Sequence, residues 1–133
     1  MVAGIGTDLI RIARMRRILA DAREDDPFLR KAFTPEERDE AARRPDPAVY
    51  YATRFAAKEA VFKALGAPGD AVPLTDIRIG AEDTGRPTAT LAGAAARYAR
   101  ERGGTRVHLS ITYEDEFAAA FALLEAEDKE GRA

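Results

Sequence analysis

The sequence predicts a single α+β domain in which an antiparallel sheet packs against a long central helix. Alternating apolar and polar residues indicate strands near both ends of the chain, and capping residues bound a long helical stretch in its middle. Strands and helices do not alternate regularly enough for a doubly wound parallel sheet. The 133 residues suit one domain, which we assign to 1–126, and residues 127–133 are expected to be a disordered tail.

The first expected strand spans residues 2–9 and contains Gly4 and Gly6. Glycine inside a strand often marks a bulge or the close approach of another backbone. Residues 10–23 repeat apolar side chains at helical spacing, which predicts a helix with one apolar stripe. The remaining positions of this helix are rich in arginine: Arg11, Arg14, Arg16, Arg17 and Arg23.

Capping signals mark the helices that follow. A helical turn is expected at 28–33, and TPEE at 34–37 combines an N-cap threonine, a proline at the first helical position and a glutamate three residues after the cap. Asp-Pro at 46–47 repeats the start signal. The helix that it opens should run to residue 65, with Gly66 as its C-cap.

The second half of the chain reads as strands around one helix, because its apolar residues alternate in short runs bounded by turn residues. The last run is rich in alanine and would also suit a helix. The expected elements are a hairpin of LTDIRIG (74–80) and TATL (88–91) around the turn DTGRP (83–87), a helix at 92–104, a strand at 105–112 and a final strand at 117–125.

Composition narrows the function classes. The net charge of −2, from 21 basic and 23 acidic residues, argues against a general nucleic-acid binder. The chain has no cysteine and one histidine, His108, so any metal is expected to be a hard cation such as Mg²⁺ or Ca²⁺ held by carboxylates. No apolar run approaches the roughly 20 residues that span a bilayer, and no signal peptide is evident, so we expect a cytoplasmic protein.

The central helix carries a carboxylate and an amine beside its apolar face. On a helical wheel, Glu59 and Lys63 border the apolar arc, and the positions next to them are small, which is expected to leave room for a ligand. The pair is either an exposed i,i+4 ion pair or a phosphate site in which Glu59 holds Mg²⁺ and Lys63 neutralises the leaving group. The small residues are Ala52, Ala56 and Ala60.

Two further charged residues bear on this site. Lys58 falls inside the apolar arc, and we expect its amine to extend to the edge of the buried surface. Asp8, at the end of the first strand, is the best second ligand for a metal beside Glu59. Its structural alternative is the N-cap of the arginine-rich helix.

Five motifs follow one another along the chain: GIGTDLIRI at 4–12, FTPEE at 33–37, RFAAKEAVFKALG at 54–66, DTGRP at 83–87 and VHLSIT at 107–112. In these motifs the chain resembles the bacterial holo-[acyl-carrier-protein] synthases, the small 4′-phosphopantetheinyl transferases, over nearly its whole length. The resemblance implies transfer of the 4′-phosphopantetheine arm of coenzyme A to a serine of an apo acyl carrier protein, with adenosine 3′,5′-bisphosphate released. It also implies a Mg²⁺ requirement and a homotrimer with active sites between protomers.

The resemblance assigns roles to individual residues. The family's metal-binding aspartate and glutamate match Asp8 and Glu59, and its catalytic lysine matches Lys63. The serine proton would leave through Glu59 directly or through a water on the metal. The residues matched to the coenzyme A site are Arg54, Lys63, Gly66, Gly85, Arg86, Pro87, His108, Ser110 and Thr112.

Simpler structural roles remain for part of this set. His108 shares one strand face with Ser110 and Thr112. By the resemblance, these residues would contact the 3′-phosphate of coenzyme A bound to the same protomer or to an adjacent one. The alternative is that this strand face is simply polar and exposed to solvent. DTGRP is alternatively just a hairpin turn. The chain departs from the family pattern at APGD (67–70), where many relatives have a threonine and another glycine, and at Tyr113, where many have a histidine.

The arginine-rich helix matches the surface on which the family docks its acidic carrier protein, and Arg14 and Arg17 are the residues expected to bind it. A solvated amphipathic helix is the alternative. A non-catalytic module that presents these arginines to an acidic protein would need no metal site, and a Mg²⁺-dependent hydrolase of nucleotide diphosphates would need no carrier. We expect coenzyme A and acyl carrier protein as partners, and neither nucleic acid nor membrane.

Overall fold

The computed structural model describes residues 1–21 and 26–127 and confirms the α+β class. The expected elements occur in the expected order, with small shifts at their ends. They are β1 (Val2–Arg11), α1 (Ile12–Asp21), α2 (Pro27–Ala32), α3 (Pro35–Ala42), α4 (Pro47–Leu65), the 3-10 helix η1 (Leu74–Asp76), β2 (Ile77–Ala81), β3 (Pro87–Leu91), α5 (Gly93–Glu101), β4 (Gly104–Tyr113) and β5 (Phe117–Ala126).

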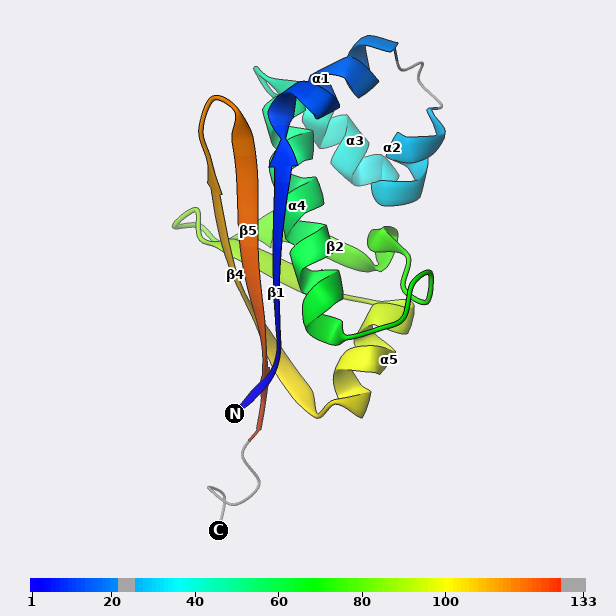
Figure 1. The fold of residues 1–133 in the computed structure, drawn as a ribbon, viewed down its shortest axis with the longest axis vertical. Coiled ribbons are helices and arrows are strands. Elements are labelled where there is room, and N and C mark those ends of the chain that lie inside the picture. The colour runs from blue at the N-terminus through cyan, green and yellow to red at the C-terminus, as the bar shows by residue number, and fades with distance from the viewer. Residues whose placement is uncertain (22–25, 128–133) are drawn as a thin grey trace.

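The strands form two antiparallel sheets around the long helix. The larger sheet has the order β1-β5-β4, and β2 and β3 form a separate hairpin. Figure 1 shows α4 running behind the larger sheet, with α1 to α3 at one end and α5 at the other. Most of the buried apolar side chains lie between α4, the sheet and the hairpin.

β1 extends further than the sequence predicts. Ile10 pairs with Ala118 and Arg11 with Phe117, so α1 begins at Ile12 rather than at residue 10. Continued pairing with β5 and burial of Ile10 favour the strand at these positions. Asp8 therefore lies within a strand and is not the N-cap of α1. The expected helical residues 22 and 23 lie outside the described part of the chain, as does the expected tail beyond Glu127.

The two glycines of β1 mark a close backbone approach, as predicted. A Cβ at Gly4 would overlap the carbonyl oxygen of Ala64, and a Cβ at Gly6 would overlap that of Ala60. The strand thus packs directly on α4. This corrects the expectation that the alanines of α4 leave room for a ligand: Ala52, Ala56 and Ala60 are each 0% exposed, and protein covers them.

Helix caps are formed largely as predicted. Thr34 Oγ1 accepts the Glu37 N–H at 3.2 Å, and Glu37 Oε1 accepts the Thr34 N–H at 2.9 Å, which completes a capping box at the start of α3. Gly66 ends α4 with a φ of 66°, in the left-handed region that favours glycine. Asp46 is the N-cap residue of α4, but its two carboxylate oxygens bind the Arg16 guanidinium, each at 2.9 Å.

Two expectations about the middle of the chain are wrong. Residues 74–76 form η1 instead of the start of a strand, with the Asp76 N–H donating to the Pro73 carbonyl. Lys58 does not extend to the surface, because its ammonium finds acceptors inside the protein. The alanine-rich last segment forms a strand, as predicted, and not a helix. Its alternate residues face α4, including Ala118, Ala120 and Ala122.

Among the helices described, none is long and apolar enough to cross a membrane.

Candidate active site

The three residues predicted for metal binding and catalysis meet where β1 passes α4. Asp8 shares the inward face of β1 with Gly6 and is half-buried. Lys63 Nζ donates to the Thr7 carbonyl at 2.9 Å and lies 3.3 Å from Asp8 Oδ1. Lys63 therefore binds across to the strand, and its position on α4 one turn after Glu59 also brings that carboxylate to the same place.

The electrostatics of this acidic site disfavour two free carboxylates. Burial raises the pKa of Asp8, against the opposing effects of the hydrogen bond and charge of Lys63 and the charge of Arg14. Burial and the charge of Asp8 raise the pKa of Glu59, and Lys63 lowers it in part. Each carboxylate is thus partly desolvated and near the other, and a bound cation would relieve this cost.

The donor set fits Mg²⁺ better than a cation that needs a full protein cage. Asp8 and Glu59 supply two carboxylates, and no group of three or more histidine, cysteine, aspartate or glutamate side chains that suits a metal occurs within residues 1–21 and 26–127. Mg²⁺ is commonly held by one or two carboxylates and completes its shell with substrate phosphate oxygens and water. The residues present fit that arrangement.

Glu59 also lines an apolar cavity of about 450 Å³ between α2, α4 and the segment before β2. Phe55, Phe62 and Leu74 form much of its wall, and Phe28 contacts Phe55 with ring centroids 5.3 Å apart. The loop at 67–70, where the sequence differs from the family pattern, contributes Gly69 and Asp70 to the same cavity. Glu59 thus borders both the acidic site and an apolar cavity.

Arg14 connects α1 to this acidic site. Its charge is close enough to oppose the rise in the pKa of Asp8, while its side chain remains exposed, as does that of Arg17. Arg16 lies elsewhere, paired with Asp46. Arg11 belongs to β1, and Arg23 falls outside the described residues. Of the two candidate carrier-binding arginines, Arg14 therefore borders the candidate metal site.

Several residues predicted for coenzyme A lie away from the acidic site. Arg54, Gly85 and Pro87 line a cavity of about 670 Å³ between α4, the tip of the β2–β3 hairpin and β4. The Arg54 guanidinium lies over the Tyr50 ring, 4.6 Å from its centroid, and donates to Thr53 Oγ1 at 3.3 Å. Neither Asp8, Glu59 nor Lys63 lines this cavity.

The other predicted nucleotide residues divide again. Arg86, Pro87 and His108 line a cavity of about 480 Å³ beside β4, and His108 Nε2 lies 2.9 Å from Glu125 Oε1 on β5. Ser110 and Thr112 are exposed on the same face of β4 as His108. At the end of α4, the Gly66 carbonyl accepts a hydrogen bond from the Arg102 guanidinium at 3.5 Å.

Sequence reasoning missed two residues of the larger nucleotide-sized cavity. Arg44 and Tyr50 both line it, and the Arg44 guanidinium lies 5.1 Å from the Tyr50 ring centroid. The available sequence signal for Arg44 was its place beside Arg43, directly before Pro45-Asp46-Pro47. Tyr113, which stands at a departure from the family pattern, lines this cavity as well.

A family model for the 4′-phosphopantetheinyl transferase superfamily matches residues 4–122. The chain therefore belongs to this superfamily, whose members are transferases.

Within it, sequence and fold are similar to the holo-[acyl-carrier-protein] synthases. The enzyme of that name from Alkalilimnicola ehrlichii is 44% identical over 130 residues, covering 96% of this chain and 100% of the relative. The crystal structure of the Neisseria meningitidis synthase matches with a TM-score of 0.82 at 36% identity, over 94% of this chain and 99% of that one. The Bacillus anthracis synthase in complex with CoA (3′,5′-ADP) matches with a TM-score of 0.76 at 33% identity, over 96% and 99%.

Proposed function

We propose that this protein transfers 4′-phosphopantetheine from coenzyme A to a serine of an apo acyl carrier protein and releases adenosine 3′,5′-bisphosphate. The observation that carries the proposal is the meeting of Asp8, Glu59 and Lys63 at one place, next to Arg14, in a chain of this superfamily. Two desolvated carboxylates beside an amine suit a phosphoryl-transfer site. A docking module alone would need none of the three.

Mg²⁺ is the proposed cofactor, held by Asp8 and Glu59, and when bound it would neutralise charge on the pyrophosphate. Lys63, already oriented by the Thr7 carbonyl, would contact the phosphate that leaves with the nucleotide. Glu59 is also the candidate acceptor of the serine proton. The cavity beside Glu59 places apolar side chains, among them Phe55 and Phe62, on one side of this carboxylate.

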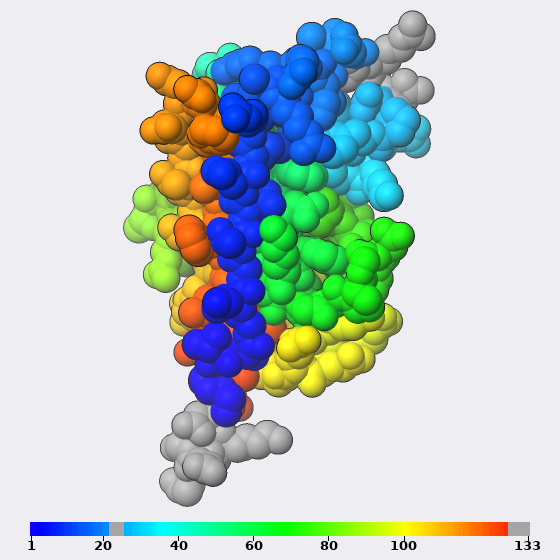
Figure 2. All heavy atoms as spheres, viewed as in Figure 1, coloured from blue at the N-terminus to red at the C-terminus, as the bar shows by residue number. Residues whose placement is uncertain are grey.

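We also propose a homotrimer with active sites shared between protomers. The outer face of the larger sheet supports it, because large apolar side chains lie exposed there: Ile5 is 71%, Leu9 64% and Phe121 64% exposed. Figure 2 shows β1 uncovered along the front of the molecule beside α4. His108, Ser110 and Thr112 point to this outer face, which would let them complete a neighbour's site.

The separation of the predicted nucleotide residues supports the same arrangement. Arg54, Gly85 and Pro87 line a cavity without Asp8 or Glu59, so one protomer alone does not gather the metal and nucleotide groups in a single cavity. An acidic carrier would dock on α1 through Arg14 and Arg17. We place the reaction in the cytoplasm, where newly made apo carrier protein is met.

Intact-mass spectrometry of a carrier protein tests the proposed reaction. The protein is incubated with apo acyl carrier protein, coenzyme A and Mg²⁺, and the expected result is a carrier heavier by one phosphopantetheine, with no gain when EDTA is present. Free phosphopantetheine or phosphate without any change in the carrier would instead indicate a hydrolase. An unchanged carrier and intact coenzyme A, over several carriers, would contradict the proposal.

A further inference from the structure

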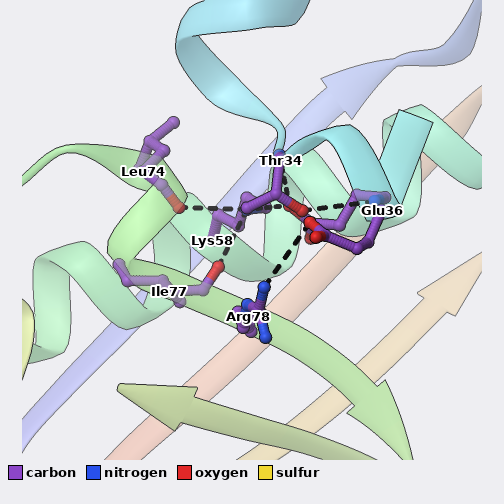
Figure 3. Close-up of polar contacts among 7 residues, drawn as sticks. Thr34, Glu36, Lys58, Leu74, Ile77 and Arg78 are labelled. Carbon is purple, nitrogen blue, oxygen red and sulfur yellow. Dashed lines mark hydrogen bonds and ion pairs between the residues drawn. The ribbon is translucent and has the colours of Figure 1, made fainter. Parts of the chain in front are cut away.

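Lys58 is a buried charged residue that takes no direct part in the acidic site. Its side chain is 0% exposed, and Nζ donates to Glu37 Oε1 at 2.8 Å, to the Leu74 carbonyl at 3.0 Å and to the Ile77 carbonyl at 2.8 Å. Figure 3 shows the ammonium between these two carbonyls and the start of α3. An ammonium group has three N–H donors, so these acceptors satisfy it completely.

The acceptors of Lys58 belong to two segments that pack against α4. Glu37 lies in the first turn of α3, where the same Oε1 closes the capping box with the Thr34 N–H at 2.9 Å. Leu74 and Ile77 lie at the start and just beyond the end of η1. Lys58 therefore ties both the start of α3 and the η1 segment to the middle of α4.

The tied segment forms one wall of the cavity beside the acidic site. Leu74 lines the apolar cavity together with Glu59, as do Val72 and Pro73 just before it. Lys58 and Glu59 are neighbours in α4, so one side chain anchors the wall and the next faces the cavity that the wall encloses. On another face, α4 is packed against β1 at Gly6. Contacts on two faces thus fix the helix that carries Glu59.

Stability alone is a weak explanation for this ion pair. The desolvation of buried charges offsets much of their attraction, and apolar side chains of similar volume often stabilise a core as well or better. Three fixed acceptors instead define one position for the ammonium, and supporting contacts of this kind orient groups in active sites. A charged pair therefore supplies geometry that an apolar contact would not.

We infer that Lys58 is a positioning residue, which holds the η1 wall of the cavity and thereby the orientation of Glu59 toward Asp8. The inference rests on the proposed function, in which Glu59 holds the metal. Lys58 acts on the site only through other residues, because its three N–H donors are bound to Glu37, Leu74 and Ile77 and none is left for substrate.

Two variants separate positioning from stability. Lys58→Met keeps a chain of similar length but leaves the Glu37 carboxylate buried without its partner, so its melting temperature should fall. Lys58→Met combined with Glu37→Gln removes both charges, keeps an oxygen for the Thr34 N–H and should recover most of that loss. We expect the double variant still to need about tenfold more Mg²⁺ for half-maximal transfer, and to lose about tenfold in kcat/KM for coenzyme A.

Hydrogen–deuterium exchange gives a readout that does not depend on transfer. Backbone amides of residues 70–77 should exchange faster in the double variant than in the wild type, while Glu37→Gln alone, which retains Lys58 and both carbonyls, should leave these amides and the Mg²⁺ dependence unchanged. Recovery of the transfer rate together with the melting temperature, or unchanged exchange at 70–77, would overturn the inference. If the wild type protects the amides of residues 70–77 from exchange but transfers no phosphopantetheine, the result would instead refute the proposed function.

Discussion

Replacing Gly6 with alanine tests whether the contact between β1 and α4 sets the geometry of the acidic site. A Cβ there would overlap the Ala60 carbonyl oxygen and lie 3.0 Å from its carbonyl carbon and 2.8 Å from the Ala64 nitrogen, whereas ordinary contact begins at 3.4 Å. Gly6 does not have a positive φ, so this overlap is the main obstacle to a side chain. The helix must therefore retreat by roughly 1 Å, a misplacement that costs an active site about 100-fold.

We expect the Gly6→Ala enzyme to lose about 100-fold in kcat/KM for coenzyme A. Moving α4 away from β1 lengthens the 2.9 Å hydrogen bond from Lys63 to the Thr7 carbonyl and the 3.3 Å contact with Asp8. The free energy of unfolding should fall by about 1–3 kcal/mol, the usual cost of overpacking. Time courses of carrier mass give the rate, and thermal denaturation monitored by circular dichroism gives the stability.

A second variant separates loss of geometry from loss of stability. Ala95 is buried in α5, away from β1, and Ala95→Gly should cost about 1–2 kcal/mol, from backbone entropy and the loss of a buried methyl group. At a temperature where both variants are folded, this control should transfer at the wild-type rate. A Gly6→Ala enzyme that also kept the wild-type kcat/KM would refute the argument that strand and helix contact positions the site.

Three further outcomes follow from the site. Glu59→Gln should abolish transfer but raise the melting temperature slightly near neutral pH. The pKa of Glu59 is higher in the folded than in the unfolded protein, so the ionised carboxylate lowers the stability above the folded pKa. Below the unfolded pKa, the difference in melting temperature from the wild type should vanish. A lower melting temperature at neutral pH would contradict this. Arg14→Glu should raise the KM for the carrier several-fold and weaken its salt dependence, and a wild type insensitive to salt would count against docking there. Mixing inactive Asp8→Ala and His108→Ala subunits should restore up to about a quarter of the sites if neighbours share them in a closed ring; no recovery after subunit exchange would argue that one protomer supplies both residues.

Local sequence signals predicted most elements of the fold, because their causes are local. The capping box at Thr34, the proline after Asp46 and the left-handed Gly66 each depend on residues within one turn of the helix end. The end of β1 was misplaced because Ile10 and Arg11 are held by pairing with β5, more than 100 residues away in the chain. Tertiary pairing overrode a pattern that also suited a helix.

The resemblance predicted the main residues of the site. The contacts that hold those residues in place could not be predicted from the periodicity of the sequence. A helical wheel gives the direction of a side chain but not its partner, so it placed Lys58 in the apolar arc without indicating Glu37 or the carbonyls of η1. For the same reason, the small face of α4 at Ala60 suggested space for a ligand, although Gly6 brings β1 into it.

The position of β5 in the sheet has a consequence for how the chain folds during synthesis. β5 follows every other described element in the chain, yet it is the central strand, and β1 and β4 each pair with it rather than with one another. β1, which carries Asp8, therefore gains a hydrogen-bonded neighbour only after residues 117–126 have been synthesised, and pairing between segments so distant in the chain is slow. A nascent chain or a product truncated before β5 has no hydrogen-bonded partner for its first strand, so premature termination should give no fragment that holds Asp8 beside Lys63.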